Sequence, residues 1–267
     1  MPSFRCARVR LVAGACALTF AAATAAQTTT LDIGYETGTD DSGYPGLVAT
    51  EAVAADAAYL ALDQPRSGRY ALAHKVTWRD PAYTSFGAPR SEATASGIRG
   101  PGNTRPGQYA AGQHRRYTFS ILLKDWEPWV ATTAAPVDIL WQFKHFGGGP
   151  DMFVGVRRNQ MILRYGNKQA TLVDDVRPYN NRWIDFRFEV LWARDASGRF
   201  SADVRLDGQS DYVRKIEEPA FATFNPAYSS PGGTIQWGLY RPDAAAVPYA
   251  AATRVVYHDD ITVTELP

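Results

Sequence analysis

A regular alternation over residues 183–192 constrains the fold more than any other feature of this sequence. Apolar side chains alternate there with polar or amphipathic ones: Ile184, Phe186, Phe188 and Val190 against Trp183, Asp185, Arg187 and Glu189. Successive side chains of a strand point to opposite faces, so the pattern predicts a strand with one buried face. Similar segments recur between turn sequences such as Asp207-Gly208, and no long helical periodicity is present. About a dozen short strands at hairpin spacing predict an all-β sandwich.

The first 26 residues have the pattern of a signal peptide and are excluded from the fold. Arg5, Arg8 and Arg10 precede an apolar stretch over residues 11–23, and small residues before Gln27 suit a signal-peptidase cut. The apolar stretch is too short for an ordinary membrane span. We therefore expect a secreted or periplasmic protein whose residues 27–267 form one domain.

Cysteine content and charge narrow the function classes. Both cysteines, Cys6 and Cys16, lie in the signal segment, so the mature chain has no disulfide and no cysteine metal site. Removal of the three early arginines changes the formal net charge from +1 to about −2, which argues against nucleic-acid binding. The expectation is a monomer with no membrane partner. Seven Trp and fourteen Tyr suit a large sheet and sugar stacking alike.

Three separated segments carry polar side chains that a buried strand would not ordinarily accept. They are residues 89–92, 142–145 and 234–241. Residues i and i+2 of a strand share a face, whereas His145 points away from Lys144 unless a bulge intervenes. If the shared faces are all concave, they form one polar groove from Arg90, Glu92, Gln142, Lys144, Gln236 and Tyr240.

These segments resemble the motifs of the alginate, heparin-I-type and glucuronan lyases. That group combines Arg-Ser-Glu, Gln-x-His and Tyr-x-Lys-x-Gly-x-Tyr in this order; the present chain has Arg90-Ser91-Glu92, then Gln142, then Gly238-Leu239-Tyr240. The similarity extends to residues 183–186 and to the closing segment 256–261. It implies a β-jelly roll of two sheets, similar to concanavalin, and an enzyme that cleaves a uronate-containing anionic polysaccharide by β-elimination.

The resemblance also suggests roles for individual residues. Arg90 and Gln142 would neutralise the substrate carboxylate, Lys144 or His145 would be the base, and Tyr240 or Tyr228 the acid. Further substrate contacts are expected from Glu92, Gln236, Tyr228, His74 and Arg241. No redox or nucleotide cofactor is required.

Two departures leave alternatives open. The histidine of Gln-x-His is replaced by Lys144, with His145 one residue late, and the first tyrosine and the lysine of the third motif are Thr234 and Gln236. Either a bulge redirects His145, or Lys144 and another tyrosine act instead, or the chain binds polysaccharide without cleaving it. Each of these residues also has a structural interpretation, such as a surface ion pair for Arg90 and Glu92.

A structural calcium site and the hydrolase classes depend on other residues. Glu36 near the first strand and Asp260 near the last could meet and hold a structural Ca²⁺ through their oxygens. No Glu-x-Asp-x-x-Glu strand, which a laminarinase-type hydrolase would need, is present, and no Gly-x-Ser-x-Gly elbow indicates a serine hydrolase. The main alternative to a lyase is a non-catalytic carbohydrate-binding jelly roll.

Overall fold

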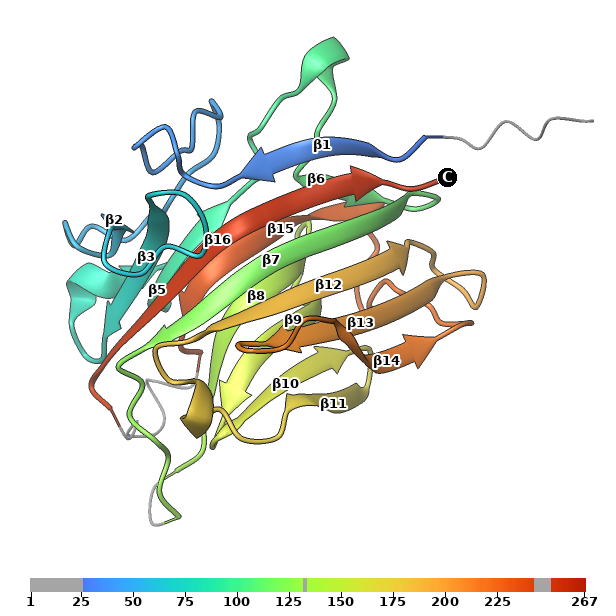
Figure 1. Cartoon of the computed structure of the whole chain (residues 1–267). Helices are drawn as coiled ribbons and strands as arrows, with labels where there is room; N and C mark the ends of the chain where they lie inside the picture. Colours follow the sequence, from blue (N-terminus) through green and yellow to red (C-terminus); the bar gives the residue numbers. More distant parts are fainter. Residues whose placement is uncertain (1–25, 132–133, 243–250) are drawn as a thin grey trace, which may run out of the picture.

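Two antiparallel sheets packed face to face make up the computed structural model, which describes residues 26–131, 134–242 and 251–267. The signal-peptide prediction falls almost entirely on residues outside these ranges. The strands of each sheet differ widely in sequence position, because the chain passes repeatedly from one sheet to the other (Figure 1). This arrangement confirms the predicted all-β jelly roll.

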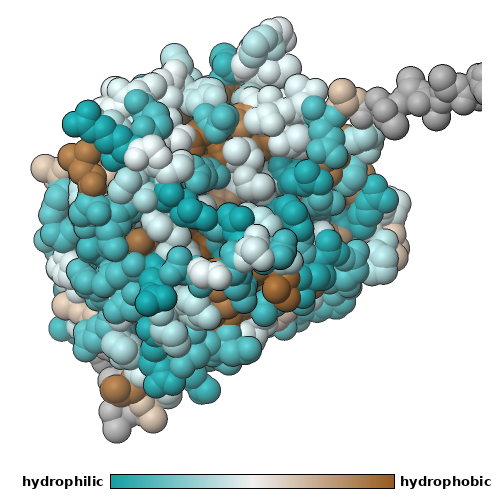
Figure 2. Space-filling model, viewed as in Figure 1, coloured by the Kyte–Doolittle hydropathy of each residue, from teal (hydrophilic) through white to brown (hydrophobic). Residues whose placement is uncertain are grey.

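The first sheet is built around the long strands β7 and β16. Its strand order is β14 (Val213–Glu218), β13 (Arg199–Leu206), β12 (Trp183–Leu191), β7 (His114–Lys124), β16 (Thr253–Glu265), β3 (Ala71–Thr77) and β2 (Ala58–Ala61), with β1 (Thr28–Ile33) also paired to β16. The space-filling view of the same side shows a mostly hydrophilic surface (Figure 2). This sheet also carries ion pairs such as Arg187–Asp203 and Arg205–Asp185.

The second sheet carries all three polar segments singled out above. Its strand order is β11 (Lys168–Val173), β10 (Gln160–Tyr165), β9 (Pro150–Arg157), β8 (Val137–His145), β15 (Gly232–Tyr240), β5 (Ala88–Thr94) and β4 (Thr84–Ser85), with β6 (Gln108–Ala110) paired to the start of β15. Within the described ranges, helical structure is limited to three 3-10 turns, Pro81–Tyr83, Pro101–Asn103 and Arg177–Tyr179.

Aromatic side chains fill the space between the sheets. Trp141 of β8 stacks on Phe119 of β7, with ring centres 3.9 Å apart and planes 2° from parallel, and it also contacts Trp237 of β15. Offset or edge-on aromatic pairs contribute about 0.5–1.5 kcal/mol beyond their buried area. Trp141 and Phe143 point into this core. Gln142 and Lys144, which alternate with them along β8, therefore point to the outer face of the sheet.

Gly238 allows β15 to lie against β5. Its φ of +143° is in the region that favours glycine, and a Cβ at this position would lie 2.3 Å from the backbone oxygen of Ser91. The register of β15 against β8 shifts between Trp237 and Tyr240 at the same place. This irregularity therefore sets where Tyr240 lies on the outer face.

Candidate active site

The outer face of the second sheet brings the expected groove residues together on three adjacent strands. In the central part of the sheet, Tyr240 lies opposite Arg90, Gln236 opposite Gln142, and Thr234 opposite Lys144. The alternate positions on these strands, including Trp141 and Trp237, belong to the core. The alternation read from the sequence thus predicts which side chains share the groove face.

A buried carboxylate links two of these side chains. Gln142 Nε2 donates a hydrogen bond to Glu92 Oε1 at 2.5 Å, and Arg90 Nε lies 3.2 Å from Glu92 Oε2 as an ion pair without hydrogen-bond alignment. Only 4% of the Glu92 side chain is exposed. Burial raises the pKa of Glu92, while Arg90, Gln142 and Lys144 oppose that rise. Glu92 therefore holds the arginine and the amide in place, which differs from the direct substrate contact expected from sequence.

Tyr240 packs against the same arginine. The guanidinium carbon of Arg90 lies 3.8 Å from the centre of the Tyr240 ring, and the exposed Phe86 ring lies on the strand turn nearby, 5.7 Å from the same carbon. A guanidinium over an aromatic face is attracted by the ring quadrupole, by about 0.5–2 kcal/mol. This contact fixes both groups, because neither can rotate without losing it.

Lys144 lies at the other end of the groove residues. Its ammonium group donates to the carbonyl oxygen of Gly148, within the turn that joins β8 to β9, and its side chain is partly buried. Burial, together with the nearby positive charge of Arg90, lowers the pKa of Lys144. A lysine in this state loses its proton more readily than a solvated one.

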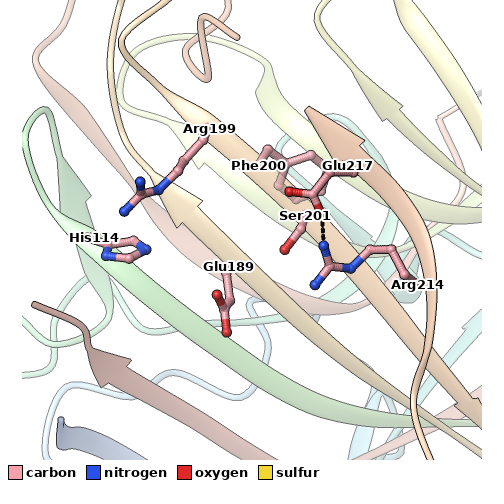
Figure 3. A pocket seen from close by; sticks show the side chains of 7 residues that line it. All are labelled: His114, Glu189, Arg199, Phe200, Ser201, Arg214 and Glu217. Atoms are coloured by element: carbon pink, nitrogen blue, oxygen red, sulfur yellow. Dashed lines mark ion pairs between the residues drawn. The ribbon is translucent and has the colours of Figure 1, made fainter. Parts of the chain in front are cut away.

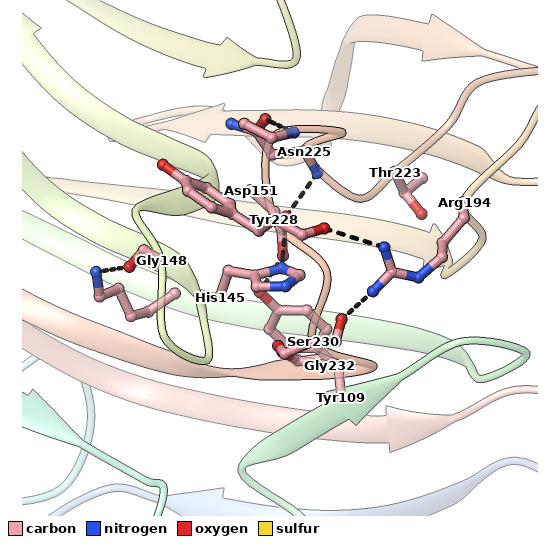
Figure 4. A network of polar contacts seen from close by, with 12 residues as sticks. Tyr109, His145, Gly148, Asp151, Arg194, Thr223, Asn225, Tyr228, Ser230 and Gly232 are labelled. Carbon is pink, nitrogen blue, oxygen red and sulfur yellow. Dashed lines mark hydrogen bonds and ion pairs between the residues drawn. The ribbon is translucent and has the colours of Figure 1, made fainter.

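His145 is on the opposite side of β8, inside the protein. Its side chain is fully buried, and its Nδ1 lies 3.0 Å from both carboxylate oxygens of Asp151. Figure 4 shows the imidazole between the rings of Tyr228 and Tyr109. A register shift does occur between Phe143 and Lys144, but it leaves His145 facing inward. The expectation that His145 could be the base is therefore corrected, because a substrate in the groove does not reach it.

Asp151 organises the network around His145. Tyr109 donates its hydroxyl to this carboxylate at 2.7 Å and the backbone N–H of Asn225 donates at 2.6 Å, while burial raises the Asp151 pKa. Arg194 holds the adjoining loop by donating to the backbone carbonyl of Tyr228 (Figure 4). Sequence reasoning missed Asp151 and Tyr109, since their proximity arises only from the packing of β6, β9 and the loop.

Tyr228 and Gln236 keep places near the groove. The Tyr228 ring lies 5.2 Å from that of His145 and covers the turn that contains Gly148, the hydrogen-bond acceptor of Lys144. Gln236 Nε2 makes a long contact of 3.4 Å to Thr94 Oγ1, and its Oε1 has no hydrogen-bond partner among the described residues. That oxygen is itself buried, so it is not open to a sugar hydroxyl in this structure.

Two further candidates lie in the interior and are removed from the site. His74, on β3 of the opposite sheet, is fully buried, contacts Ser91 Oγ at 3.1 Å and has a lowered pKa caused chiefly by burial. Arg241 is also fully buried, 3.1 Å from Asp138 and bonded to the Ala251 and Ala252 carbonyls. Arg241 follows the groove residue Tyr240, so its side chain points away from the groove.

The carboxylates proposed for calcium hold a loop. Glu36 accepts hydrogen bonds from the backbone N–H groups of Arg69 and Tyr70, and Asp260 accepts from Ser67 Oγ at 2.5 Å. The two residues contact the same short loop, Glu36 through Arg69 and Tyr70 and Asp260 through Ser67. Within the part of the chain that the structure describes, no group of three His, Cys, Asp or Glu residues is placed to share a metal ion.

The surface holds two further hollows of interest. One, of about 310 Å³, adjoins Tyr240 on the groove face and is lined by Phe153, Arg157 and Arg164 among others. Alternation over residues 152–157 and 161–165 could have placed Phe153 and Arg164 there. The other, of about 210 Å³, lies on the first sheet and contains Arg199, with Arg214 paired to Glu217 (Figure 3).

Comparison with solved structures shows which known proteins share this fold. A search of the curated proteins found no match. Among solved structures, an endo-β-1,4-glucuronan lyase from the fungus Trichoderma reesei is similar at 17% identity and a TM-score of 0.63, covering 90% of this chain and 96% of its own. The catalytic domain of a glycoside hydrolase family 131 protein from Coprinopsis cinerea is similar at 12% identity and a TM-score of 0.58, covering 90% and 95%. These likenesses show a shared fold.

The sequence itself matches a family description over most of its length. Residues 36–262 fit the polysaccharide lyase family, a span that contains every residue of the groove described above. The chain therefore belongs to the polysaccharide lyase family and is a lyase enzyme with a polysaccharide substrate.

Proposed function

We propose that the protein is an exported lyase that cleaves a uronate-containing polysaccharide by β-elimination in the groove of the second sheet. The observation that carries this proposal is the placement of Arg90, Gln142, Lys144 and Tyr240 on one face of β5, β8 and β15. Together they supply two cations, an amide and a phenol. These groups meet the chemical needs of the reaction without a redox or nucleotide cofactor.

The first requirement is an acidic C5 proton. The carboxylate at C5 of a uronate disfavours loss of this proton until its charge is neutralised. Arg90 carries a permanent positive charge, and Gln142 has a second amide N–H beyond the one given to Glu92. Arg90, whose side chain is 13% exposed, can donate to the substrate carboxylate, and Gln142, which is 1% exposed, supports the site through its hydrogen bond to Glu92. Glu92 keeps them in position while that carboxylate binds.

The second requirement is a base and an acid on either side of the bond that breaks. Lys144, whose pKa is lowered, takes the C5 proton in its neutral form. The electron pair of the C–H bond forms the C4–C5 double bond, and the C4–O bond breaks. Tyr240 donates its hydroxyl proton to the departing oxygen. One proton is taken and one is given, so the step balances.

Glucuronan is the first substrate to test. At 17% identity, a glucuronan lyase shares the fold of this chain over nearly the whole of both chains. Export is proposed from the pattern of residues 1–26. Among the described residues, no helix combines the length and apolar character needed to cross a bilayer. A monomer suffices for the proposed site, because all its residues come from one sheet.

The test is direct. The mature chain is incubated with glucuronan, alginate, hyaluronan and heparin, and the absorbance of an unsaturated uronate is followed near the ultraviolet edge. We expect a steady rise with at least one polymer. A flat absorbance with all four, together with retained binding, would support the binding-protein alternative, which is favoured by the replacement of the family's histidine by Lys144.

A further inference from the structure

The outer face of the second sheet continues past the proposed catalytic residues toward β10. A row of side chains crosses the strands there, because Gln236 lies opposite Gln142, Gln142 opposite Phe153, and Phe153 opposite Arg164. Neighbouring strands are about 4.8 Å apart, so Arg164 is roughly 10 Å from Gln142 across the sheet. A polysaccharide lying across the strands would pass over Phe153 and Arg164 after leaving Gln142.

Phe153 and Arg164 form an apolar surface with a cation at its edge. The guanidinium carbon of Arg164 lies 5.7 Å from the Phe153 ring centre, and both side chains are partly exposed. Arg164 Nε donates to Gln169 Oε1 at 3.2 Å. Among the described residues, Arg164 is in no ion pair with a carboxylate within 4.0 Å. Its terminal N–H groups can therefore donate to a carboxylate of a ligand.

The hollow around Phe153 and Arg164 is lined by apolar side chains and by arginines. Its volume is about 310 Å³, it reaches Tyr240, and its walls include Arg157 as a second cation and, among the described residues, no acidic side chain. Arg157 Nε donates to the carbonyl of Ala135 at 3.2 Å, and within the described part of the chain no carboxylate forms an ion pair with Arg157. Ile139 and Val137 complete the apolar floor.

The pocket on the first sheet provides a contrast. Glu189 and Glu217 lie among its walls, and Figure 3 shows Arg214 paired with Glu217. Arg214 is also paired with Asp203. Carboxylates in the walls repel an anionic ligand, and paired arginines have less charge to offer it. The described walls of the hollow beside Tyr240 contain neither a carboxylate nor an ion-paired arginine, so this hollow is the better place for an acidic sugar.

We propose that Phe153 and Arg164 form a binding subsite for an acidic sugar unit next to the unit that is cleaved, an inference that rests on the proposed function. The C–H face of a pyranose ring packs on Phe153, and the carboxylate of that sugar pairs with Arg164 in the bidentate geometry that arginine favours. The subsite selects polymers with uronates in succession over those in which neutral sugars alternate.

The experiment measures binding of saturated hexamers of glucuronate and of mannuronate, each beside its carboxyl-reduced, neutral counterpart. Calorimetry uses the mature chain with Tyr240→Phe to prevent turnover. Arg164→Gln is compared with Arg199→Gln, which makes the same change at an exposed arginine of the other sheet. We expect Arg164→Gln to weaken binding of at least one acidic hexamer roughly tenfold and Arg199→Gln to leave it unchanged. Arg164→Lys should restore part of the affinity.

The outcomes separate this inference from the proposed function. Equal affinities of the two glutamine variants, an equal loss with the neutral hexamers, or no binding of either acidic hexamer would overturn the subsite. Thermal melting checks that Arg164→Gln is folded, and the Arg164→Lys variant supplies the same comparison if it is not. If the enzyme cleaves a polymer and Arg164→Gln does not change that cleavage, the subsite is rejected and the lyase function stands. If binding depends on Arg164 but no polymer is cleaved, the lyase function is rejected and the subsite stands.

Discussion

Substitution of the two neighbours Lys144 and His145 should give opposite results. His145→Leu removes the Nδ1 donor 3.0 Å from Asp151 but roughly keeps the volume of the side chain. A buried hydrogen bond to a charged group contributes about 1.5–3 kcal/mol, so we expect about 2 kcal/mol of lost stability. For a chain of this size that corresponds to a melting temperature lower by about 4–8 °C. The kcat of folded enzyme should stay within a few-fold of wild type, because His145 faces away from the groove.

Lys144→Ala should lower the activity and leave the stability nearly unchanged. Its ammonium group makes one hydrogen bond to the partly exposed Gly148 carbonyl, so stability should change by less than about 1 kcal/mol. Loss of a general base lowers the rate by about 10²–10⁴-fold, and we expect a fall in kcat of that size. Lys215→Ala, at an exposed lysine of β14 in the other sheet, is the matched control and should change neither quantity.

Both measurements use the same samples. Initial rates are followed by absorbance of the unsaturated product, on whichever polymer the wild type cleaves, and unfolding is followed by circular dichroism at the same pH. A well-folded His145→Leu enzyme that loses a hundredfold in kcat, beside a Lys144→Ala enzyme of full activity, would refute the reasoning. That result would mean that the imidazole reaches the substrate and the ammonium group does not.

Three further predictions concern buried groups. Glu92→Gln should reduce kcat/KM at least tenfold and lower the melting temperature, since it leaves Arg90 without its carboxylate; unchanged kinetics would contradict the positioning role. Gly238→Ala should cost at least about 2 kcal/mol in urea unfolding, because its Cβ would meet the Ser91 carbonyl; a smaller loss would mean that β5 can move aside. Burial lowers the pKa of His258 from 6.5 to about 3, so the unfolded chain binds a proton that the folded chain refuses between these values. The free energy of unfolding therefore falls as the pH falls through this window, by about 3 kcal/mol at pH 4 relative to pH 8 from His258 alone. His258→Gln should remove that part of the pH dependence, measured by urea titrations at the two pH values. An unaltered pH dependence would contradict the assignment.

Much of the fold follows from side-chain alternation. The pattern over residues 183–192 corresponds to β12, in which Ile184, Phe186 and Phe188 are buried. Alternation also places Arg90, Gln142 and Tyr240 on the groove face, because strand periodicity is a local property of the backbone. What it leaves open is the pairing of strands that are distant in the sequence, such as β5 with β15, whose partners lie more than a hundred positions apart.

The errors have physical causes that a local pattern does not contain. His74 looks like a polar residue available to substrate, yet Ser91, brought close by the packing of the two sheets, supplies a partner inside the protein. Glu36 looks like a metal ligand, but its carboxylate satisfies backbone N–H groups of a loop that follows some thirty residues later. Arg241 could have been placed correctly, because it follows Tyr240 in the sequence and strand alternation therefore points its side chain to the other face of the sheet.

The hairpin of β8 and β9 carries both Lys144 and His145, so the contacts that hold His145 in place also bear on the chemistry proposed for Lys144. Asp151 anchors His145, Tyr109 and the loop at Asn225, and it thereby fixes the turn whose Gly148 carbonyl accepts from the Lys144 ammonium group. A lysine has four rotatable bonds and needs such an anchor to act at one position. The replacement of the family's histidine by Lys144 is therefore compatible with catalysis, because the adjacent histidine holds the backbone that carries the lysine and the acceptor that orients it.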